Sequence, residues 1–160
     1  MTTRTFVYTI GYQGATMQAF LAALTAARVE LLVDVRAVAS SRRPGFSKTA
    51  LAANLDGAGI KYLHLRGLGT PADGRAAVRA GRPAEMRRIY AAHLETDVAR
   101  EQLDELTDLV RAGQRIALLC FEADPEHCHR SIVASELGTR IPIRVENLFA
   151  QDAADAGDAE

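Results

Sequence analysis

Apolar runs of strand type alternate along the chain with segments of helical period. The first run, Thr5–Ile10, is rich in β-branched and aromatic residues, and the second, Glu30–Val35, is typical of a strand buried on both faces. Further strands are predicted for Lys61–Leu65, Arg115–Phe121 and Pro142–Leu148. Because strands buried on both faces are typical of parallel sheets, these runs predict a parallel sheet.

The segments between the strands carry helix start signals. Thr16 is a predicted N-cap for a helix whose apolar residues recur at helical spacing, and Ser47 is a predicted N-cap for a second helix. Two more helices are predicted over Glu85–Leu94 and Asp97–Ala112. The last helix is predicted to begin at Asp124-Pro125, an acidic N-cap followed by proline.

The strict alternation of strands and helices predicts a single Rossmann-like three-layer α/β domain over residues 1–150, with a mostly parallel sheet of about five strands and helices on both faces. The stretch Leu68–Pro83, rich in Gly, Pro and Arg, is predicted to be a long loop. Residues 151–160 are acidic and are predicted to form a disordered tail. In such sheets ligands bind beyond the carboxyl ends of the strands, so polar residues that directly follow strands are expected to converge.

Asp34 and Arg36 follow the second strand and share a face, because strand side chains alternate. One interpretation is a preorganised polar site in which Asp34 acts as a general base or orients a substrate hydroxyl and Arg36 holds an anion. The other is an acid that caps a turn and an arginine that pairs with it. Tyr62 and His64 share a face of the next strand, and His64 is expected to support the site from behind.

Two loops contribute candidate ligand-binding residues. Ser40–Ser47 offers hydroxyls, guanidinium groups and glycine beside a helix start, which is what an anion site uses. Its candidates are Ser41, Arg42 and Phe46, while Arg43 is better explained as part of a solvated basic loop. Gly11 and Tyr12, after the first strand, are candidates because glycine lets backbone approach a ligand, although the dinucleotide fingerprint is incomplete.

The segment Cys120–Arg130 carries the strongest local signal, and four interpretations of it stay open. In the first, Arg130, His129 and a helix N-terminus bind an anion while Glu122 grips a donor. In the second, Cys128 is a nucleophile, since a helix N-terminus and adjacent basic groups lower a thiol pKa.

The other two interpretations use both cysteines. A metal site would combine Cys120 and Cys128 with His127 or His129, but seven intervening residues do not match the usual spacing of structural zinc sites. A reversible Cys120–Cys128 disulfide would lack the C-x-x-C arrangement. Both cysteines also fit the role of small buried hydrophobic residues.

The composition limits which binding partners and which cellular compartment are expected for this protein. The net charge is −1, and residues 1–150 carry +3 because four acidic residues lie in 151–160. The Arg-rich stretch Arg66–Arg88 leaves a nucleic-acid-binding module open, although near-neutral charge and scarce aromatics argue against it. No apolar run approaches the roughly 20 residues of a membrane span. No export leader is visible, and two close cysteines are no secreted framework, so a cytoplasmic protein without a membrane partner is expected.

The chain resembles the domain-of-unknown-function family 488, a widespread prokaryotic group. The resemblance runs, in order, from residue 5 to about residue 148 and rests on these segments: Thr9–Tyr12, Leu32–Arg36, Ser41–Phe46, Tyr62–Leu65, Leu68-Gly69, Leu119–Pro125 and Cys128–Arg130. Two departures are Ala39, where the family usually has proline, and Thr70, where a second glycine is common. The resemblance implies the α/β fold and the same site residues, but no established reaction.

The Asp34-Val35-Arg36 element also resembles rhodanese-like domains. Those domains and Cys-dependent phosphatases need a longer loop between the catalytic cysteine and its arginine than Cys128 and Arg130 provide, so their mechanism is not carried over. The sequence therefore predicts an enzyme or ligand-binding domain for a small anionic substrate, with Arg36, Arg42 and Arg130 as anion ligands. A hydrolase or transferase is the expected reaction class, and neither a cofactor nor an oligomeric state is indicated.

Overall fold

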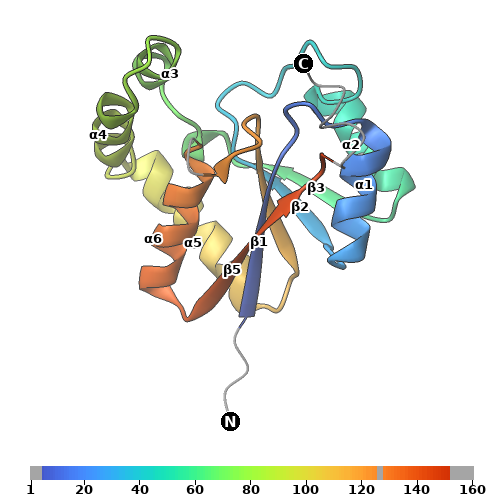
Figure 1. Cartoon of the computed structure of the whole chain (residues 1–160). Helices are drawn as coiled ribbons and strands as arrows, with labels where there is room; N and C mark the ends of the chain where they lie inside the picture. The colour runs from blue at the N-terminus through green and yellow to red at the C-terminus, as the bar shows by residue number, and fades with distance from the viewer. Residues whose placement is uncertain (1–4, 126–127, 152–160) are drawn as a thin grey trace.

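The computed structural model describes residues 5–125 and 128–151, and it confirms the α/β fold class. Five strands form one sheet in the order β3-β2-β4-β1-β5, and every neighbouring pair is parallel. The strands are β1 Thr5–Gly11, β2 Leu31–Asp34, β3 Lys61–His64, β4 Ile116–Cys120 and β5 Ile143–Phe149. Helices cover both faces of this sheet, which makes three layers (Figure 1).

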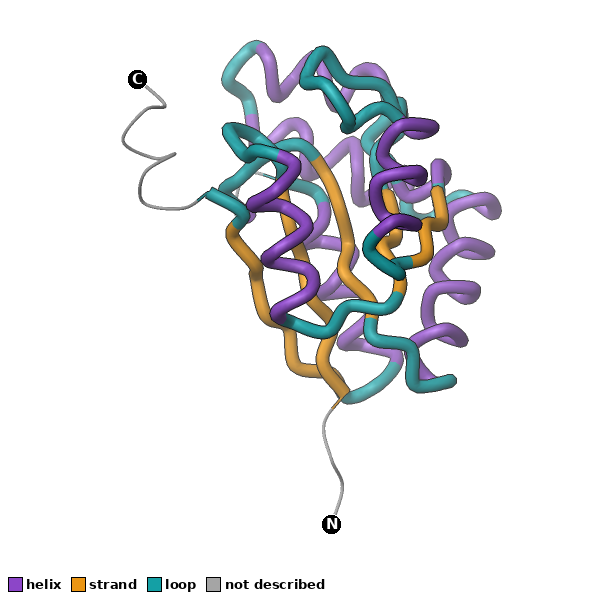
Figure 2. Tube along the Cα trace, turned by 90° about the vertical axis from the view of Figure 1, so that its right-hand side faces the viewer, coloured by secondary structure: helices purple, strands orange, loops and turns teal. Residues whose placement is uncertain are grey.

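Helices connect the strands on the two faces in separate groups. The first group, α1 Met17–Ala26 and α2 Lys48–Gly57, covers one face, which Figure 2 views from the outside. On the other face, α5 Asp97–Arg111 and α6 Arg130–Arg140 lie against the sheet, and α3 Ala72–Arg79 and α4 Pro83–His93 pack beyond them near the carboxyl ends of the strands. A short 3-10 helix, η1 Arg66–Leu68, precedes α3.

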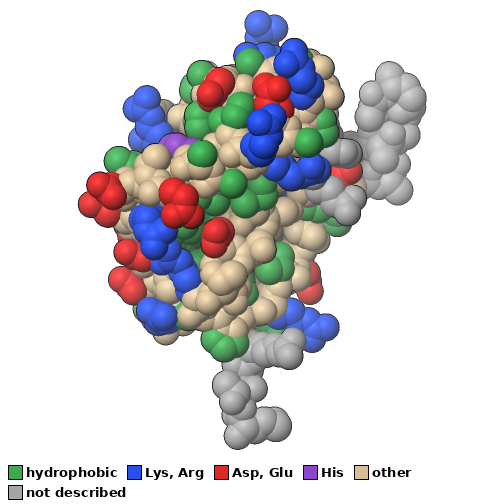
Figure 3. Space-filling model, turned by 90° about the vertical axis from the view of Figure 1, so that its left-hand side faces the viewer, with side chains coloured by type: hydrophobic (Ala, Val, Ile, Leu, Met, Phe, Trp, Pro, Cys, Tyr) green, Lys and Arg blue, Asp and Glu red, His purple; other side chains and the backbone are tan. Residues whose placement is uncertain are grey.

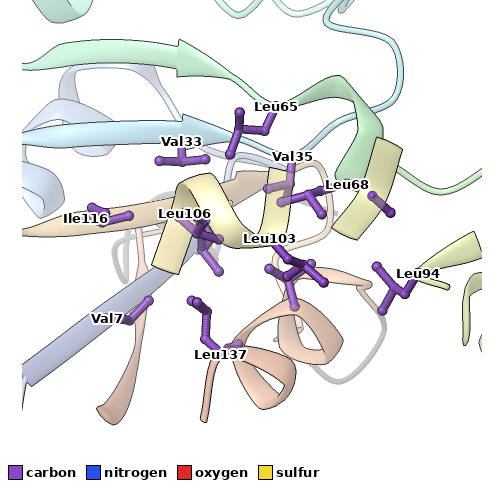
Figure 4. Packing of buried hydrophobic residues seen from close by; sticks show 14 of the residues in the cluster. Val7, Val33, Val35, Leu65, Leu68, Leu94, Leu103, Leu106, Ile116 and Leu137 are labelled. Atoms are coloured by element: carbon purple, nitrogen blue, oxygen red, sulfur yellow. The ribbon is translucent and has the colours of Figure 1, made fainter. Parts of the chain in front are cut away.

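Each face of the sheet has its own apolar core, because side chains alternate along a strand. In β2, Leu32 packs with the residues of α1 and α2, whereas Leu31 and Val33 pack with those of α5 and α6. Figure 4 shows this second core, in which Leu106 of α5 and Leu137 of α6 lie against the strands. The two cores hold the carboxyl ends of the strands in fixed positions.

The predicted long loop over Leu68–Pro83 is wrong, because α3 occupies half of it. Asp73 in the first turn of α3 and Arg79 in its last turn both interact favourably with the helix dipole and so stabilise this helix. Gly74 lies inside this helix, where a Cβ would come within 2.6 Å of the Thr70 side chain. The glycine that suggested a loop therefore allows close packing within a helix.

The last helix also begins later than predicted. Helix α6 starts at Arg130 with His129 as its N-cap, rather than at Asp124-Pro125. The Cys128 N–H donates to the Pro125 carbonyl over 3.3 Å. Cys128 and His129 consequently lie before α6 rather than in its first turns. The candidate ligand His127 lies outside the described residues.

The loops after β1 and β4 lie side by side at the carboxyl edge of the sheet, where the Gln13 N–H donates to the Phe121 carbonyl over 2.8 Å. These strands are neighbours, but β1 leads into α1 on one face and β4 leads toward α6 on the other. Loops that diverge in this way leave room for a ligand at the carboxyl ends of the strands. Predicted site residues follow both strands.

At the C-terminal end, the Gln151 side-chain amide donates to the carbonyls of Gly11 and Gln13. The predicted disordered tail lies, from residue 152 onward, outside the described residues. None of the helices in the described ranges combines the length and the hydropathy needed to cross a bilayer.

Candidate functional site

Asp34 and Arg36 form a buried ion pair at the end of β2. Arg36 Nε and Nη2 donate to the two carboxylate oxygens of Asp34 over 2.9 and 2.7 Å. The Arg36 backbone N–H donates to Oδ1 of the same carboxylate over 3.0 Å. His64 Nε2 donates to the Arg36 carbonyl over 2.7 Å and so supports the pair from β3. The Asp34 carboxylate and the Arg36 guanidinium therefore face each other and neutralise each other's charge.

Neighbouring groups provide further hydrogen bonds to this pair. Arg36 Nη1 donates to the Tyr12 hydroxyl over 3.2 Å and to the Phe46 carbonyl over 2.8 Å. The Tyr62 hydroxyl donates to Asp34 over 2.6 Å. Burial lowers the pKa of Arg36, but the hydrogen bonds and charge of Asp34 outweigh it, so the pKa is raised overall. Arg36 is a permanent cation with an internal partner.

The loop between β2 and α2 is closed on itself by hydroxyl groups. The Ser41 N–H donates to Ser47 Oγ over 2.9 Å, and Ser47 Oγ donates back to the Ser41 carbonyl over 3.1 Å. Arg43 donates from Nη2 to the Ala15 carbonyl, which ties the loop to the segment before α1. Ser47 thus serves the loop rather than capping α2 with its side chain. The exposed Arg42 projects from this ordered frame.

Arg130 is fully buried at the start of α6, beneath the loop after β4. Its Nη1 donates to Cys120 Sγ over 3.0 Å and to the Glu122 carbonyl over 2.5 Å, and its Nη2 donates to the Ala123 carbonyl over 3.2 Å. The buried Nε has no hydrogen-bond partner among the residues that the structure describes. Burial lowers the pKa of Arg130 to about 10. A Cβ at Gly11 would lie 1.7 Å from the Glu122 carbonyl oxygen and 2.8 Å from Arg130, so this glycine makes room for the arrangement.

Cys120 and Cys128 are joined in a disulfide that links the end of β4 to the segment before α6. Both residues are buried. The Arg130 backbone N–H donates to Cys128 Sγ over 3.5 Å, and Glu122 Oε1 lies 3.6 Å from Cys120 Sγ. Charged groups of both signs therefore surround the sulfur atoms.

His129 is held as a neutral imidazole with a defined tautomer. Its Nε2 lies 2.6 Å from the Val35 carbonyl, which only accepts, so Nε2 carries the proton. Nδ1 is then an acceptor, and it lies 3.8 Å from Cys128 Sγ. Burial lowers the pKa of His129 to about 4, with the charge of Arg130 acting in the same direction and the hydrogen bond to Val35 opposing it. At neutral pH the ring is uncharged.

A cavity of about 480 Å³ lies where the loops after β1, β2 and β4 meet α3. Its charged lining among the described residues consists of five arginines and one carboxylate: Arg36, Arg42, Arg43, Arg75, Arg79 and Glu122. Apolar and aromatic side chains form part of the wall: Tyr12, Val38, Val78, Met86 and Phe121. We call this space the arginine cavity. Its charge favours an anionic ligand.

The structure brings several predicted site residues together around the arginine cavity. Tyr12, Arg36, Ser41, Arg42, Glu122 and His129 line it. The remaining predicted residues lie behind the lining or beside it: Gly11, Asp34, Phe46, Cys128 and Arg130. Phe46 stacks on Tyr12 with ring centroids 4.6 Å apart, and so supports the wall.

Sequence reasoning did not place Arg75 and Arg79 at this site. Both line the arginine cavity from α3, four residues apart and so on the same side of the helix. Arg75 Nη1 donates to the Thr70 carbonyl over 2.8 Å. The charges at the two ends of α3 could have revealed this helix, but the glycine and proline residues of the segment outweighed them.

A three-residue cluster has the composition of a metal site. One ligand atom from each of Cys120, Cys128 and His129 lies within 4.8 Å of the others. A metal would require both sulfurs as thiolates, whereas the disulfide joins them. The guanidinium of Arg130, 3.0 Å from Cys120 Sγ, also disfavours a cation there.

The fold and the site define an α/β domain with a ligand cavity at the carboxyl ends of a parallel sheet. The family profile described as "Domain of unknown function DUF488" matches residues 16–137, and the chain belongs to this family. Comparison with curated proteins and with solved structures finds no significant match. The matched region contains the cavity-lining residues after β2 and β4 together with α3.

Proposed function

We propose that this domain binds a small anionic ligand, phosphate- or nucleotide-like, in the arginine cavity and acts on it as an enzyme. The observation that carries the proposal is the lining: five arginines face one carboxylate at the carboxyl ends of the strands. Ligands of open parallel sheets bind at this edge. Guanidinium groups bind phosphate and carboxylate through paired N–H donors.

Three of the five arginines are suited to contact the ligand directly. Arg36 is occupied by Asp34, and Arg43 is engaged with the Ala15 carbonyl. Arg42 and Arg79 are exposed, and Arg75, which is half-buried at the cavity wall, donates from Nη1 to the Thr70 carbonyl. We therefore assign anion binding to Arg42, Arg75 and Arg79, in place of the expected set that included Arg130.

The apolar wall supports a ligand with a flat or apolar portion besides its charge. Phe121 is 42% exposed, and its ring meets Tyr12 edge to face at 5.4 Å between centroids. Val38 and Val78 are also exposed at the cavity. Exposed aromatic and branched side chains beside arginines suit a base or similar ring attached to a phosphate.

Two groups in the lining can transfer or hold a proton. Glu122 carries the lining carboxylate, and it would orient a ligand hydroxyl or act as a general base. His129 lines the cavity as a neutral imidazole and would act as the proton acceptor through Nδ1. Asp34, saturated by Arg36 and Tyr62, would instead position Arg36.

Calorimetric titration of the purified protein with pyrophosphate and with nucleoside mono- and diphosphates tests the proposal. Arg42→Gln, Arg75→Gln and Arg79→Gln are each expected to weaken binding about tenfold, the loss of roughly 1.4 kcal/mol. Arg88→Gln is the matched control, because it removes an exposed guanidinium from α4 outside the cavity. Equal binding by all four variants would refute the assignment.

The nucleic-acid alternative rests on the basic residues of α3 and α4. Figure 3 shows Lys and Arg side chains over this part of the surface with Asp and Glu among them, and Asp73 and Glu85 belong to these helices. Such mixed charge makes a weak phosphate footprint. Salt-sensitive binding of an oligonucleotide that depends on Arg87 and Arg88 as strongly as on Arg75 and Arg79 would favour this alternative.

The metal alternative needs the reduced protein. Elemental analysis of protein purified in a reducing buffer, with Cys128→Ser as its control, separates it from ligand binding. Stoichiometric zinc or iron lost in the variant would favour the metal site, and its absence in both would support anion binding alone.

A further inference from the structure

The Cys120–Cys128 disulfide lies between two cavities. Cys120 lines the arginine cavity, whereas Cys128 lines a second cavity of about 350 Å³. The second cavity is formed by α4 and α6, with Met86 and Arg87 on one side and Ser131, Ser135 and Glu136 on the other. Each cysteine of the buried pair therefore borders a different cavity.

The two sulfur atoms also have different neighbours. The buried guanidinium of Arg130 lies 3.0 Å from Cys120 Sγ. Cys128 Sγ lies 3.8 Å from His129 Nδ1, which is an unprotonated acceptor, and receives a longer hydrogen bond of 3.5 Å from the uncharged backbone N–H of Arg130. If the disulfide bond breaks, the Arg130 guanidinium stabilises a negative charge on Cys120 Sγ, whereas His129 Nδ1 can accept a hydrogen bond from the Cys128 S–H. This difference makes Cys120 the better leaving group, because a thiol with the lower pKa leaves faster.

Arg130 is fixed in its place for this role. Its carbonyl partners at Glu122 and Ala123 hold the guanidinium, and Gly11 leaves the space it occupies. Within the described part of the chain, its buried Nε finds no hydrogen-bond partner. Two carboxylates oppose this effect: Glu122 Oε1 lies 3.6 Å from Cys120 Sγ, and the charges of Glu122 and Asp124 both act on Arg130. The closer contact, in a medium of low dielectric, favours the thiolate.

We propose that Cys120 and Cys128 form a reversible thiol–disulfide centre, in which an incoming thiolate attacks Cys128 through the second cavity and Cys120 leaves as a thiolate held by Arg130. A bond forms between the incoming sulfur and Cys128 Sγ, and the electron pair of the Cys120–Cys128 bond stays on Cys120. When the reductant is a small dithiol, its second sulfur loses a proton to solvent and attacks the first. Cys128 leaves and takes up a proton, so the protein gains two electrons and the dithiol becomes a disulfide.

This centre is independent of the proposed anion binding, because its chemistry needs no ligand in the arginine cavity. Its first test is a redox titration of the folded wild-type protein with reduced and oxidised glutathione, followed by alkylation and mass spectrometry. We expect two species, the dithiol and the internal disulfide, that interconvert fully. Thiols that stay alkylable in excess oxidised glutathione would overturn the proposal, as would a disulfide that dithiothreitol reduces only after unfolding.

The second test identifies the attacked sulfur. The oxidised protein is treated briefly with reduced glutathione, quenched with acid, alkylated with iodoacetamide and mapped by peptide mass. The expected intermediate carries glutathione on Cys128 and the alkyl group on Cys120. Glutathione on Cys120 with alkylated Cys128 would contradict the assigned direction.

The third test concerns the cation. In the reduced protein, Arg130→Gln is expected to slow alkylation of Cys120 about tenfold near pH 6.5, because the thiolate loses its counter-charge. Glu122→Gln should act in the opposite direction, and Arg88→Gln, which removes an exposed guanidinium from α4 outside both cavities, should leave the rate unchanged. Should Arg130→Gln fail to fold, the wild-type rate profile decides: a half-maximal rate below the free-thiol pKa of about 8.5 supports the proposal, and one at or above it overturns it.

Discussion

Two buried arginines stand at the carboxyl ends of the strands in opposite surroundings. Arg36 has its carboxylate partner within 3 Å, through two side-chain hydrogen bonds, and its pKa is raised. Arg130 donates to a sulfur and to two carbonyls, keeps an unsatisfied Nε, and has a pKa lowered to about 10. The role of a buried arginine therefore depends on its partners and not on burial alone. Arg36 organises its surroundings, whereas Arg130 is placed to stabilise a charge that forms during a reaction.

Removing the partner of Arg36 should have the largest effect. Asp34→Ala leaves a buried guanidinium without its counter-charge and is expected to lower the free energy of unfolding by about 4 kcal/mol. Urea denaturation followed by circular dichroism measures this change. The double variant Asp34→Ala with Arg36→Met should recover part of the loss, since no buried charge remains unpaired. A double variant as unstable as the sum of both single variants would show that the pair is not coupled.

The neutral state of His129 predicts the next largest effect, which depends on pH. The unfolded chain protonates this histidine below about pH 6.5, whereas the folded protein keeps it neutral down to about pH 4. The unfolded state therefore binds the additional proton, and the free energy of unfolding falls by on the order of 3 kcal/mol as the pH drops through this window. His129→Gln keeps a donor for Val35 and should reduce this slope. Equal slopes in both proteins would contradict the buried neutral ring.

A smaller loss of stability is expected from a substitution at Gly11, which lies beside Arg130. Gly11→Ala places a methyl group against the Glu122 carbonyl and the Arg130 guanidinium. Overpacking of this kind costs about 1–3 kcal/mol in thermal or urea unfolding. Gly57→Ala is the matched control, because a Cβ there meets nothing within 4 Å. A loss in the free energy of unfolding no larger than that of the control would mean that the loop after β4 shifts to accommodate the methyl group.

The smallest effect on stability is expected at the exposed arginine of the cavity. Arg79→Gln should change the free energy of unfolding by less than about 0.5 kcal/mol, because the side chain is exposed on α3. Thermal unfolding without ligand measures this quantity. The same variant is expected to lose anion affinity, which separates a binding role from the structural role of Arg36. A large loss of stability would assign Arg79 to the fold instead.

The sequence predicted the sheet and half of the site because buried parallel strands leave a strong apolar signal. The run Glu30–Val35 located β2, and the alternation of side chains placed Asp34 and Arg36 together. The helix α3 escaped prediction, since Gly74 and the flanking prolines resemble loop signals when the packing against Thr70 is not visible. Missing this helix also meant missing Arg75 as a cavity residue.

The direction in which Arg130 points could not be predicted either. A side chain at a helix start can face the ligand or the protein interior, and only the absence of a Cβ at Gly11 leaves space for it inside. The meeting of Cys120 and Cys128 was one of four open interpretations for the same reason. The sequence before α6 carries no distinct pattern that would place Cys128 beside the end of β4.

We propose that Arg42, Arg75 and Arg79 bind an anion, while the buried Arg36 and Arg130 keep their internal partners. The most direct measurement is a titration of the protein with pyrophosphate followed by the arginine Nε–H signals in nitrogen–proton NMR. Saturable shifts of Arg42, Arg75 and Arg79, with Arg36 and Arg88 unchanged, are the predicted result. A shift of Arg36 or Arg130 while Arg75 and Arg79 stay still would contradict the account.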